Sequence, residues 1–304
     1  MVENFAALAA RIAQLKKEKG AVILAHYYTT PEVQAVADFL GDSLALSVKA
    51  KDIEAKVILF AGVHFMAETN KILSPEKKVF LSHAEAGCPM AEQISVEELK
   101  ELKKKYPNHT VVAYINTTAE LKTLCDVCVT SASAVNIVKN IENKDILFIP
   151  DCNLGQWVAS KVPEKNFTFI KGGCPSHLRI TVDDVKSAKA AHPNAKILIH
   201  PECLPEVSAY GDFLGSTTAI MDYAKSSTET EFIIGTENSI VEHLQFTCPD
   251  KRFYPLSKNC VCENMKLTTL ADIYQCLIGN GGEEILLDET TIQKARVCID
   301  RMLA

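Results

Sequence analysis

Three cysteines in short contexts are spaced almost evenly along the chain. Cys174, preceded by two glycines and followed by proline, lies 86 residues after Cys88, which also stands between glycine and proline. Cys262 lies 88 residues after Cys174. Self-similarity at a fixed period indicates repeated units, and a period of about 87 residues is too long for a solenoid. The spacing therefore predicts three small duplicated domains, each of which supplies one thiolate to a shared centre.

Other landmarks repeat in the same register, with offsets of 88 and then 86 residues. In each copy an apolar, strand-like run ends at a polar or aromatic residue, a hydroxyl residue follows, and a second apolar run comes next. Four landmarks in one register are hard to obtain by chance. The repeated positions are His26, Tyr114 and His200 at the first run ends, Ser43, Ser131 and Thr217 in the hydroxyl clusters, and Phe60, Phe148 and Ile234 at the second run ends.

The fold class follows from the alternation of short apolar runs with helical patterns. Continuous apolar runs of this length are typical of buried parallel strands, and their alternation with helices predicts α/β domains with helices on both faces of parallel sheets. We expect domains at residues 1–90 together with C-terminal helices at 266–304, at 91–176, and at 177–265. Sites in such sheets form outside the carboxyl ends of the strands, so the prediction is a pseudo-three-fold arrangement around one central site.

Local patterns give the expected elements. Asp42 or Ser43 is suited to cap the helix that begins there. Expected helices cover residues 5–19, 31–40, 43–51, 65–72, 96–106, 119–124, 133–140, 153–161, 182–191, 217–225, 239–244, 268–278 and 289–302, and expected strands cover 21–25, 57–60, 78–81, 111–114, 146–148, 166–170, 197–200, 232–234 and 252–254.

Charge and hydropathy exclude several classes of partner. The chain has 304 residues, a formal net charge of −6 and a pI near 5.8, whereas a nucleic-acid or anionic-membrane surface would call for a basic face. No apolar run approaches the roughly 18 residues of a membrane span. Residues 1–19 are charged and amphipathic, unlike a signal peptide. We therefore expect a cytoplasmic protein with neither nucleic acid nor membrane as a partner.

Most of the eleven cysteines are not part of a sequence pattern that indicates a disulfide, metal or redox site. An odd number in such a chain does not indicate a disulfide framework. Cys125 and Cys128 form a C-x-x-C pair, but no second pair follows at finger-like spacing and the pair lies at a predicted helix edge, so its use for metal or redox chemistry stays open. Small buried apolar residues are the interpretation for Cys152, Cys203, Cys248, Cys276 and Cys298.

The three periodic cysteines suit an iron–sulfur cluster better than zinc. A structural zinc site usually takes four ligands with paired spacing, and these cysteines are isolated. Three thiolates would leave one iron of a [4Fe–4S] cluster open to bind substrate as a Lewis acid. Cys260 competes with Cys262 as the third ligand, and Cys262 fits the period better.

Several short motifs are found along the chain: Ala25-His26-Tyr27-Tyr28, Gly41-Asp42-Ser43, Ala113-Tyr114-Ile115-Asn116-Thr117, Gly173-Cys174-Pro175-Ser176-His177, His200-Pro201-Glu202-Cys203, Gly215-Ser216-Thr217-Thr218 and Cys262-Glu263-Asn264-Met265-Lys266. Together these motifs closely resemble the quinolinate synthase family, and the resemblance covers nearly the whole chain. One departure is Cys260-Val261-Cys262, where some members have C-x-x-C-x-x-C; this puts in doubt the role of Cys260, not that of Cys262.

The resemblance implies a triangular arrangement of three related α/β domains around a [4Fe–4S] cluster that Cys88, Cys174 and Cys262 ligate. It implies a transferase of NAD biosynthesis that condenses iminoaspartate with dihydroxyacetone phosphate, giving quinolinate with loss of phosphate and two waters. Both substrates are anions, and an aspartate oxidase or dehydrogenase would supply the iminoaspartate.

The residue types suit the proton transfers of such a reaction. His26, Tyr28, Tyr114, His200 and Glu202 are the candidate catalytic residues, although a lone His or Tyr at a strand end is more often structural. By the resemblance, Tyr28 and Glu202 are the best acid/base candidates. Tyr114, Asn116 and His200 would position the substrate together with His26, and His177 would contact a carboxylate or the phosphate.

Anion binding must come from local donors, since no basic cluster accompanies the motifs. Ser43, Ser131 and Thr217 each precede a helical run, where unpaired amides favour anions, so we interpret them as three anion sockets. The alternative is that they are helix N-caps. The same two roles, lining the site or starting a helix, are open for Met66, Asn153 and Glu237.

Two other functions remain open at this level. An aconitase-like iron–sulfur hydro-lyase also uses an open iron, but none of that family's motifs is present. A redox or metal-sensing protein would use Cys125 and Cys128, and would leave the repeated hydroxyls and strand-end residues without a purpose.

Overall fold

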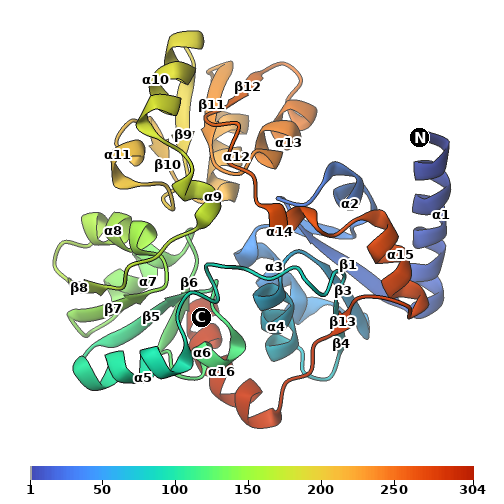
Figure 1. The fold of residues 1–304 in the computed structure, drawn as a ribbon, viewed down its shortest axis with the longest axis horizontal. Helices are drawn as coiled ribbons and strands as arrows, with labels where there is room; N and C mark the ends of the chain where they lie inside the picture. Colours follow the sequence, from blue (N-terminus) through green and yellow to red (C-terminus); the bar gives the residue numbers. More distant parts are fainter. Residues whose placement is uncertain (1) are drawn as a thin grey trace. The chain divides into compact units, whose positions relative to one another are not determined.

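The computed structural model describes residues 2–304, drawn in Figure 1. The chain divides into two compact units. Unit 1 comprises the residues up to Cys88 together with Cys262–Arg296, and unit 2 comprises Pro89–Val261 together with Val297–Ala304. Among the described residues, no helix combines the length and the apolar character that crossing a membrane would need.

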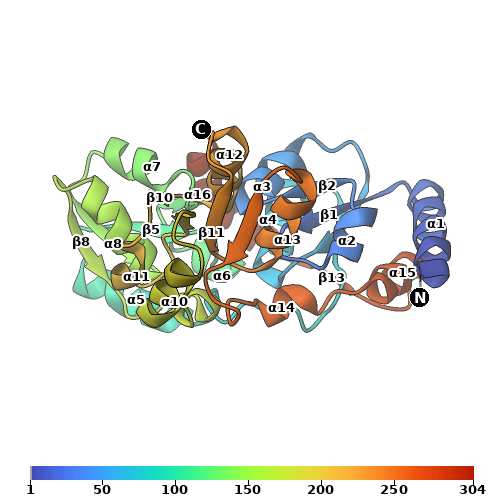
Figure 2. The ribbon, with the colours of Figure 1, turned by 90° about the horizontal axis from the view of Figure 1, so that it is seen from above.

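Unit 1 contains one five-stranded sheet of order β13-β4-β3-β1-β2, in which only β13 is antiparallel to its neighbour. Helices α1 and α15 lie side by side in both views (Figures 1 and 2), and Ile12 and Ile273 of these helices join Ile23 in the unit's core. The elements are α1 (Val2–Lys19), β1 (Ala21–His26), α2 (Pro31–Val36), β2 (Phe39–Gly41), α3 (Ser43–Asp52), β3 (Val57–Ala61), α4 (His64–Leu73), β4 (Lys78–Leu81), α14 (Glu263–Lys266), α15 (Leu270–Ile278) and β13 (Glu283–Glu284).

Unit 2 contains two four-stranded parallel sheets, of order β6-β5-β7-β8 and β10-β9-β11-β12. The central strands are buried beyond their first residues, as Phe148 and Phe232 illustrate. The elements are α5 (Val96–Lys105), β5 (Thr110–Tyr114), α6 (Ala119–Lys122), β6 (Val127–Val129), α7 (Ala134–Asn140), β7 (Asp145–Ile149), α8 (Cys152–Lys161), β8 (Asn166–Phe169), α9 (Pro175–Leu178), α10 (Val182–Ala191), β9 (Lys196–Ile199), α11 (Pro205–Ser208), β10 (Phe213–Leu214), α12 (Thr217–Ser226), β11 (Glu231–Gly235), α13 (Ser239–Thr247), β12 (Arg252–Pro255) and α16 (Glu289–Leu303), the last of which begins in unit 1.

The three parallel sheets share one strand order and one register. In each copy the second strand pairs with the first, and the first then pairs with the third. The pairs Leu24 with Phe39, Val112 with Val127 and Leu198 with Phe213 are again separated by 88 and 86 residues. The α/β class with several parallel sheets is therefore confirmed, and the sequence period is the period of the sheets. The arrangement around a common centre and the boundaries at 1–90, 91–176 and 177–265 stay predictions.

An edge strand of two or three residues in each copy was missing from the prediction: β2, β6 and β10. The expected helix over residues 31–40 is wrong beyond Val36, because Ala37 is already extended and β2 follows. The prediction that Cys128 lies at a helix edge is also wrong, because Cys128 lies within the edge strand β6.

An aspartate before each edge strand joins it to the central strand. The carboxylates of Asp38, Asp126 and Asp212 accept the main-chain N–H groups of the central strands at 2.8, 2.7 and 2.8 Å. The main-chain N–H groups of these aspartates in turn donate to carbonyls of the same strands. Because both bonds recur at 88 and 86 residues, this clamp is a further landmark of the repeat.

Candidate functional site

The loops that follow the three central strands place site residues at equivalent positions. His26, Tyr114 and His200 stand at the strand ends, and two residues further on come Tyr28, Asn116 and Glu202. The local turn is similar in two copies. Nδ1 of His26 accepts the main-chain N–H of Tyr28 at 3.1 Å, and Nδ1 of His200 accepts that of Glu202 at 3.3 Å. In the neutral imidazole this leaves Nε2 as the donor.

Glu202 is the centre of a buried polar network in unit 2. Its side chain is 5% exposed, and its Oε2 lies 2.7 Å from Nδ1 of His177 and 3.7 Å from Nδ1 of His200. Burial acts to raise the pKa of Glu202. The two imidazoles and a hydrogen bond from the Tyr114 side chain outweigh burial and lower this pKa to about 2, so the carboxyl group is ionised.

The two imidazoles are themselves held in place. Nε2 of His200 lies 3.2 Å from Oγ of Ser131, and Nε2 of His177 lies 2.9 Å from Oγ1 of Thr236. The two rings lie 4.9 Å apart, centroid to centroid. Ser131 thus contacts the network, and its predicted role as an anion socket stays a prediction. Thr236, directly after β11, was missed by the sequence reasoning.

Asp151 is a second buried carboxyl group that the sequence reasoning missed. It is the N-cap of α8, where its Oδ1 accepts the N–H groups of Asn153 and Leu154 at 2.9 Å. Its Oδ2 accepts the main-chain N–H of Cys174 at 3.1 Å. Burial, with the charge of Glu202 as the next cause, raises the pKa of Asp151 to about 7. An aspartate between a strand and a helix is a capping signal that could have identified it.

The glycine before Cys174 allows a close approach. A Cβ atom added to Gly173 would lie 3.1 Å from Nδ2 of Asn153, tighter than most Cβ contacts. Asn153 also donates from Nδ2 to the main-chain oxygen of Glu202 at 3.2 Å. Glycine therefore lets the Cys174 segment pack against α8, and Asn153 lines the network as well as starting a helix.

Cys88, Cys174 and Cys262 occupy equivalent positions in their copies. In each copy the carbonyl two residues before the cysteine accepts the N–H of a residue at the start of the helix after the third strand, at 2.8, 3.0 and 3.0 Å. The acceptors are Ala86, Gly172 and Cys260. Cys260 thus corresponds to Ala86 and Gly172, and it is buried, whereas the three periodic cysteines are partly exposed.

Unit 1 contains two of these cysteines and the first strand end. Nδ2 of Asn264 donates to the main-chain oxygen of Gly87 at 2.7 Å, which ties the segment before Cys88 to α14. Nζ of Lys266 donates to the main-chain oxygen of Tyr28 at 2.6 Å. The rings of His26 and Tyr28 meet edge to face at 4.5 Å. These contacts join the motif from Cys262 to Lys266 to the main chain at Gly87 and at Tyr28 within unit 1.

At two of the three predicted anion sockets, Ser43 and Thr217, the helix cap is the residue before the socket. Asp42 caps α3 by accepting the N–H of Ala45, and Ser216 caps α12 by accepting that of Ala219. The alternative that Ser43 and Thr217 are N-caps is therefore wrong, since each is the first residue inside its helix.

Asn116 carries a signal of ligand binding. Its Oδ1 is buried and has no hydrogen-bond partner among residues 2–304. A buried acceptor left in this state costs about 1–3 kcal/mol, so a ligand donor at this position would be stabilising. By contrast, Oε2 of Glu237 accepts the N–H of Ser239, and Met66 is buried within α4, which agrees with helix-start roles.

The other cysteines are mostly core residues. Cys203, Cys248, Cys276 and Cys298 are buried as predicted, whereas Cys152 is only partly buried, so that prediction is wrong for Cys152. Cys152 is the first residue of α8. The pair Cys125 and Cys128 is buried too, and Sγ of Cys128 lies 3.3 Å from Sγ of Cys298.

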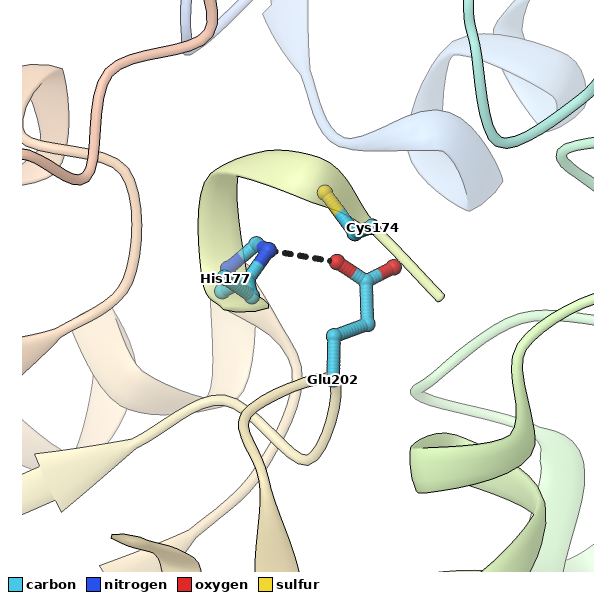
Figure 3. Close-up of side chains that lie close together, drawn as sticks. All are labelled: Cys174, His177 and Glu202. Atoms are coloured by element: carbon cyan, nitrogen blue, oxygen red, sulfur yellow. Dashed lines mark ion pairs between the residues drawn. The ribbon is translucent and has the colours of Figure 1, made fainter. Parts of the chain in front are cut away.

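One group of three potential metal donors lies close together in the described part of the chain. Sγ of Cys174, a ring nitrogen of His177 and a carboxylate oxygen of Glu202 are all within 4.8 Å of one another. Figure 3 shows the three side chains converging from α9 and from the loop after β9.

Buried acid/base groups and thiols at the carboxyl ends of parallel strands define the class of this protein as an α/β enzyme. The model of the family described as quinolinate synthetase A protein matches residues 10–304. A quinolinate synthase of Caldicellulosiruptor bescii is 46% identical over 300 residues, covering 99% of each chain. Quinolinate synthase 2 of Methanosarcina acetivorans is 47% identical over 297 residues, covering 98% of this chain and 95% of the relative. The chain belongs to the quinolinate synthase family.

Proposed function

We propose that this chain is the transferase of NAD biosynthesis that condenses iminoaspartate with dihydroxyacetone phosphate to quinolinate, with loss of phosphate and two waters. Family membership over almost the full length supports the assignment. The observation that carries it is the buried Glu202 carboxylate, held ionised between His177 and the Tyr114 side chain. This is the kind of preorganised proton acceptor and donor set that ring closure requires.

Cys88, Cys174 and Cys262 fit the [4Fe–4S] cluster that the family resemblance implies. They are soft thiolate donors at equivalent positions of three copies, and they are partly exposed where most other cysteines are buried. When bound, a cluster held by three thiolates supplies a Lewis-acid iron with an open position for a substrate oxygen.

The residues of unit 2 have distinct chemical tasks. Glu202, being ionised, accepts a proton from substrate, and His177 exchanges that proton through the 2.7 Å contact. His200 donates from Nε2 to Oγ of Ser131, and the hydroxyl that is oriented in this way donates to a substrate anion. The unpartnered Oδ1 of Asn116 accepts an N–H, which the imine substrate offers after protonation.

The first strand end supplies a further acid. The phenol of Tyr28 is the candidate for protonating the leaving oxygens, with His26 packed against its ring. Ser43, Ser131 and Thr217 donate to the phosphate and carboxylates of the two substrates. An aspartate oxidase or dehydrogenase is the functional partner that supplies iminoaspartate. The acidic chain works in the cytoplasm without a nucleic-acid or membrane partner.

Anaerobic purification followed by iron, sulfide and visible-absorbance measurements, together with a quinolinate-formation assay, tests this function. Replacing Cys88, Cys174 or Cys262 by Ala should remove bound iron and activity. Cys260→Ala and Cys276→Ala are the controls and should keep both. Loss of the cluster in Cys260→Ala but not in Cys262→Ala would show that the assigned third ligand is wrong.

The same preparation separates the alternatives. Dehydration of a hydroxy acid without quinolinate formation would favour an iron–sulfur hydro-lyase. Absence of an iron–sulfur absorbance band in anaerobic protein would favour a redox or metal-sensing role for Cys125 and Cys128.

A further inference from the structure

The triad of Cys174, His177 and Glu202 has the composition of a single-metal site. Thiolate, imidazole and carboxylate are the three donor types that zinc accepts in proteins, at about 2.0–2.3 Å. The three donor atoms lie within 4.8 Å of one another (Figure 3), close enough for side-chain rotation to bring them around one ion. Three protein ligands leave a fourth position for water, as in catalytic zinc sites.

The donors are oriented by residues behind them. Thr236 contacts Nε2 of His177 at 2.9 Å, which turns Nδ1 toward the carboxylate. Asp151 accepts the main-chain N–H of Cys174. Such supporting hydrogen bonds fix ligand geometry and are a regular part of metal sites. Hydrogen bonds from neighbouring residues therefore orient the donor groups of the triad, which is not expected of a chance cluster at the surface.

The change needed to admit an ion is small. Nδ1 of His177 and Oε2 of Glu202 are 2.7 Å apart. Two ligand atoms bound to one tetrahedral zinc lie about 3.3 Å apart, so this pair must open by about 0.6 Å. A divalent ion balances the charges of the Glu202 carboxylate and the Cys174 thiolate that would bind it. The penalty of burying an uncompensated charge therefore does not arise.

We infer that, in the chain that lacks its cluster, Cys174, His177 and Glu202 bind a single Zn²⁺ or Fe²⁺ ion. The inference meets the proposed function at one residue, because Cys174 is also a proposed cluster ligand. The two metal states therefore exclude each other. Zn²⁺ in the triad occupies Cys174 and so blocks cluster assembly. Fe²⁺ binds to the same three residues before the cluster is assembled.

The test is an anaerobic Co²⁺ titration of the full-length, cluster-free protein. A single thiolate ligand in a tetrahedral site gives a sulfur-to-cobalt charge-transfer band with visible d–d bands, and Zn²⁺ should displace both. We expect Cys174→Ser, His177→Gln and Glu202→Gln each to weaken Co²⁺ binding by at least about tenfold. Cys88→Ala and Cys262→Ala are matched controls and should bind Co²⁺ as the parent chain does.

Proton release gives a second measurement that needs no variant. Binding of Zn²⁺ to the triad, which contains a single thiol, should release fewer protons per ion than binding to a site made of three cysteines. Zn²⁺ added before cluster reconstitution should slow the growth of the iron–sulfur absorbance in the parent chain, and less so in His177→Gln.

The outcomes distinguish this inference from the proposed function. If Cys88→Ala or Cys262→Ala abolished Co²⁺ binding while His177→Gln and Glu202→Gln retained it, the metal would sit on the three cysteines and the triad would be overturned. If Co²⁺ bound to the triad but no iron–sulfur cluster could be reconstituted, the triad would stand and the cluster proposal would fall.

Discussion

Asp42 and Ser43 allow stability and anion binding to be separated on neighbouring residues. Asp42 is the N-cap of α3, and its Oδ1 accepts the N–H of Ala45 at 3.0 Å. Ser43 is the first residue of the helix and is partly exposed. If Ser43 is an anion socket, Asp42→Ala should act on stability and Ser43→Ala on binding.

The magnitudes can be set from these contacts. Loss of an N-cap hydrogen bond costs about 1 kcal/mol, which lowers the melting temperature by about 2–4 °C for a unit of this size. Replacing a partly exposed serine that makes no such bond changes the free energy of unfolding by at most about 0.5 kcal/mol. A hydrogen bond to a charged ligand group contributes about 1.5–3 kcal/mol, so Ser43→Ala should weaken binding of a dicarboxylate by roughly 10- to 100-fold.

The assay is calorimetric titration of the anaerobic, cluster-containing protein with quinolinate, beside thermal unfolding of the same samples. We expect Asp42→Ala to melt earlier and, once folded, to bind quinolinate nearly as well as the parent. Ser43→Ala should melt normally and bind poorly. Normal quinolinate binding by Ser43→Ala, or a fall in its melting temperature equal to that of Asp42→Ala, would refute the socket.

Three further predictions follow from other contacts. Tyr28→Phe should fold and keep its cluster but turn over at least about 100-fold more slowly in the quinolinate assay, because only the acid is lost; near-normal turnover would make Tyr28 structural. Asp126→Ala should lower the free energy of unfolding by about 1.5–3 kcal/mol in chemical denaturation, since its carboxylate accepts the N–H of Val111 at 2.7 Å. An unchanged denaturation midpoint would show that this hydrogen bond does not stabilise the fold. Burial raises the pKa of the Cys203 thiol, so iodoacetamide should modify Cys88 in cluster-free protein long before Cys203, as mass spectrometry would show.

The repeat made much of the fold predictable from the sequence. Strand pairing is a tertiary property, yet equivalent residues of duplicated copies take equivalent registers, so the spacing of His26, Tyr114 and His200 already contained it. The edge strands were lost because two or three residues carry no period of their own. At residues 31–40 the helical pattern in the sequence continues beyond Val36, where the helix ends. The chain is extended there because Asp38 accepts the main-chain N–H of Ile23 in β1.

Only those site residues whose position follows from the neighbouring sequence could be predicted. Strand-end residues such as Tyr114 and Glu202 follow from the apolar runs before them. Thr236 was missed because its partner is remote: the ring of His177 is 59 residues away. Asp151 carries a local capping signal, but its contact with the N–H of Cys174, 23 residues away, does not show in the sequence. No periodicity encodes such contacts, which exist only after the sheets have formed.

Equivalent positions in the three copies carry different chemistry, and this difference bears on the reaction. Two residues after His26, Tyr114 and His200 the chain has a phenol at Tyr28, an amide at Asn116 and a carboxylate at Glu202. Three identical groups would serve a ligand with three-fold symmetry, whereas the two substrates of the proposed function offer different groups to be protonated, deprotonated and bound. In that proposal the divergence at a single position of each copy provides one acid, one hydrogen-bond acceptor and one base. It follows that exchanging Asn116 and Glu202 would conserve composition and backbone but place an uncharged amide against His177, where only a carboxylate completes the ion pair.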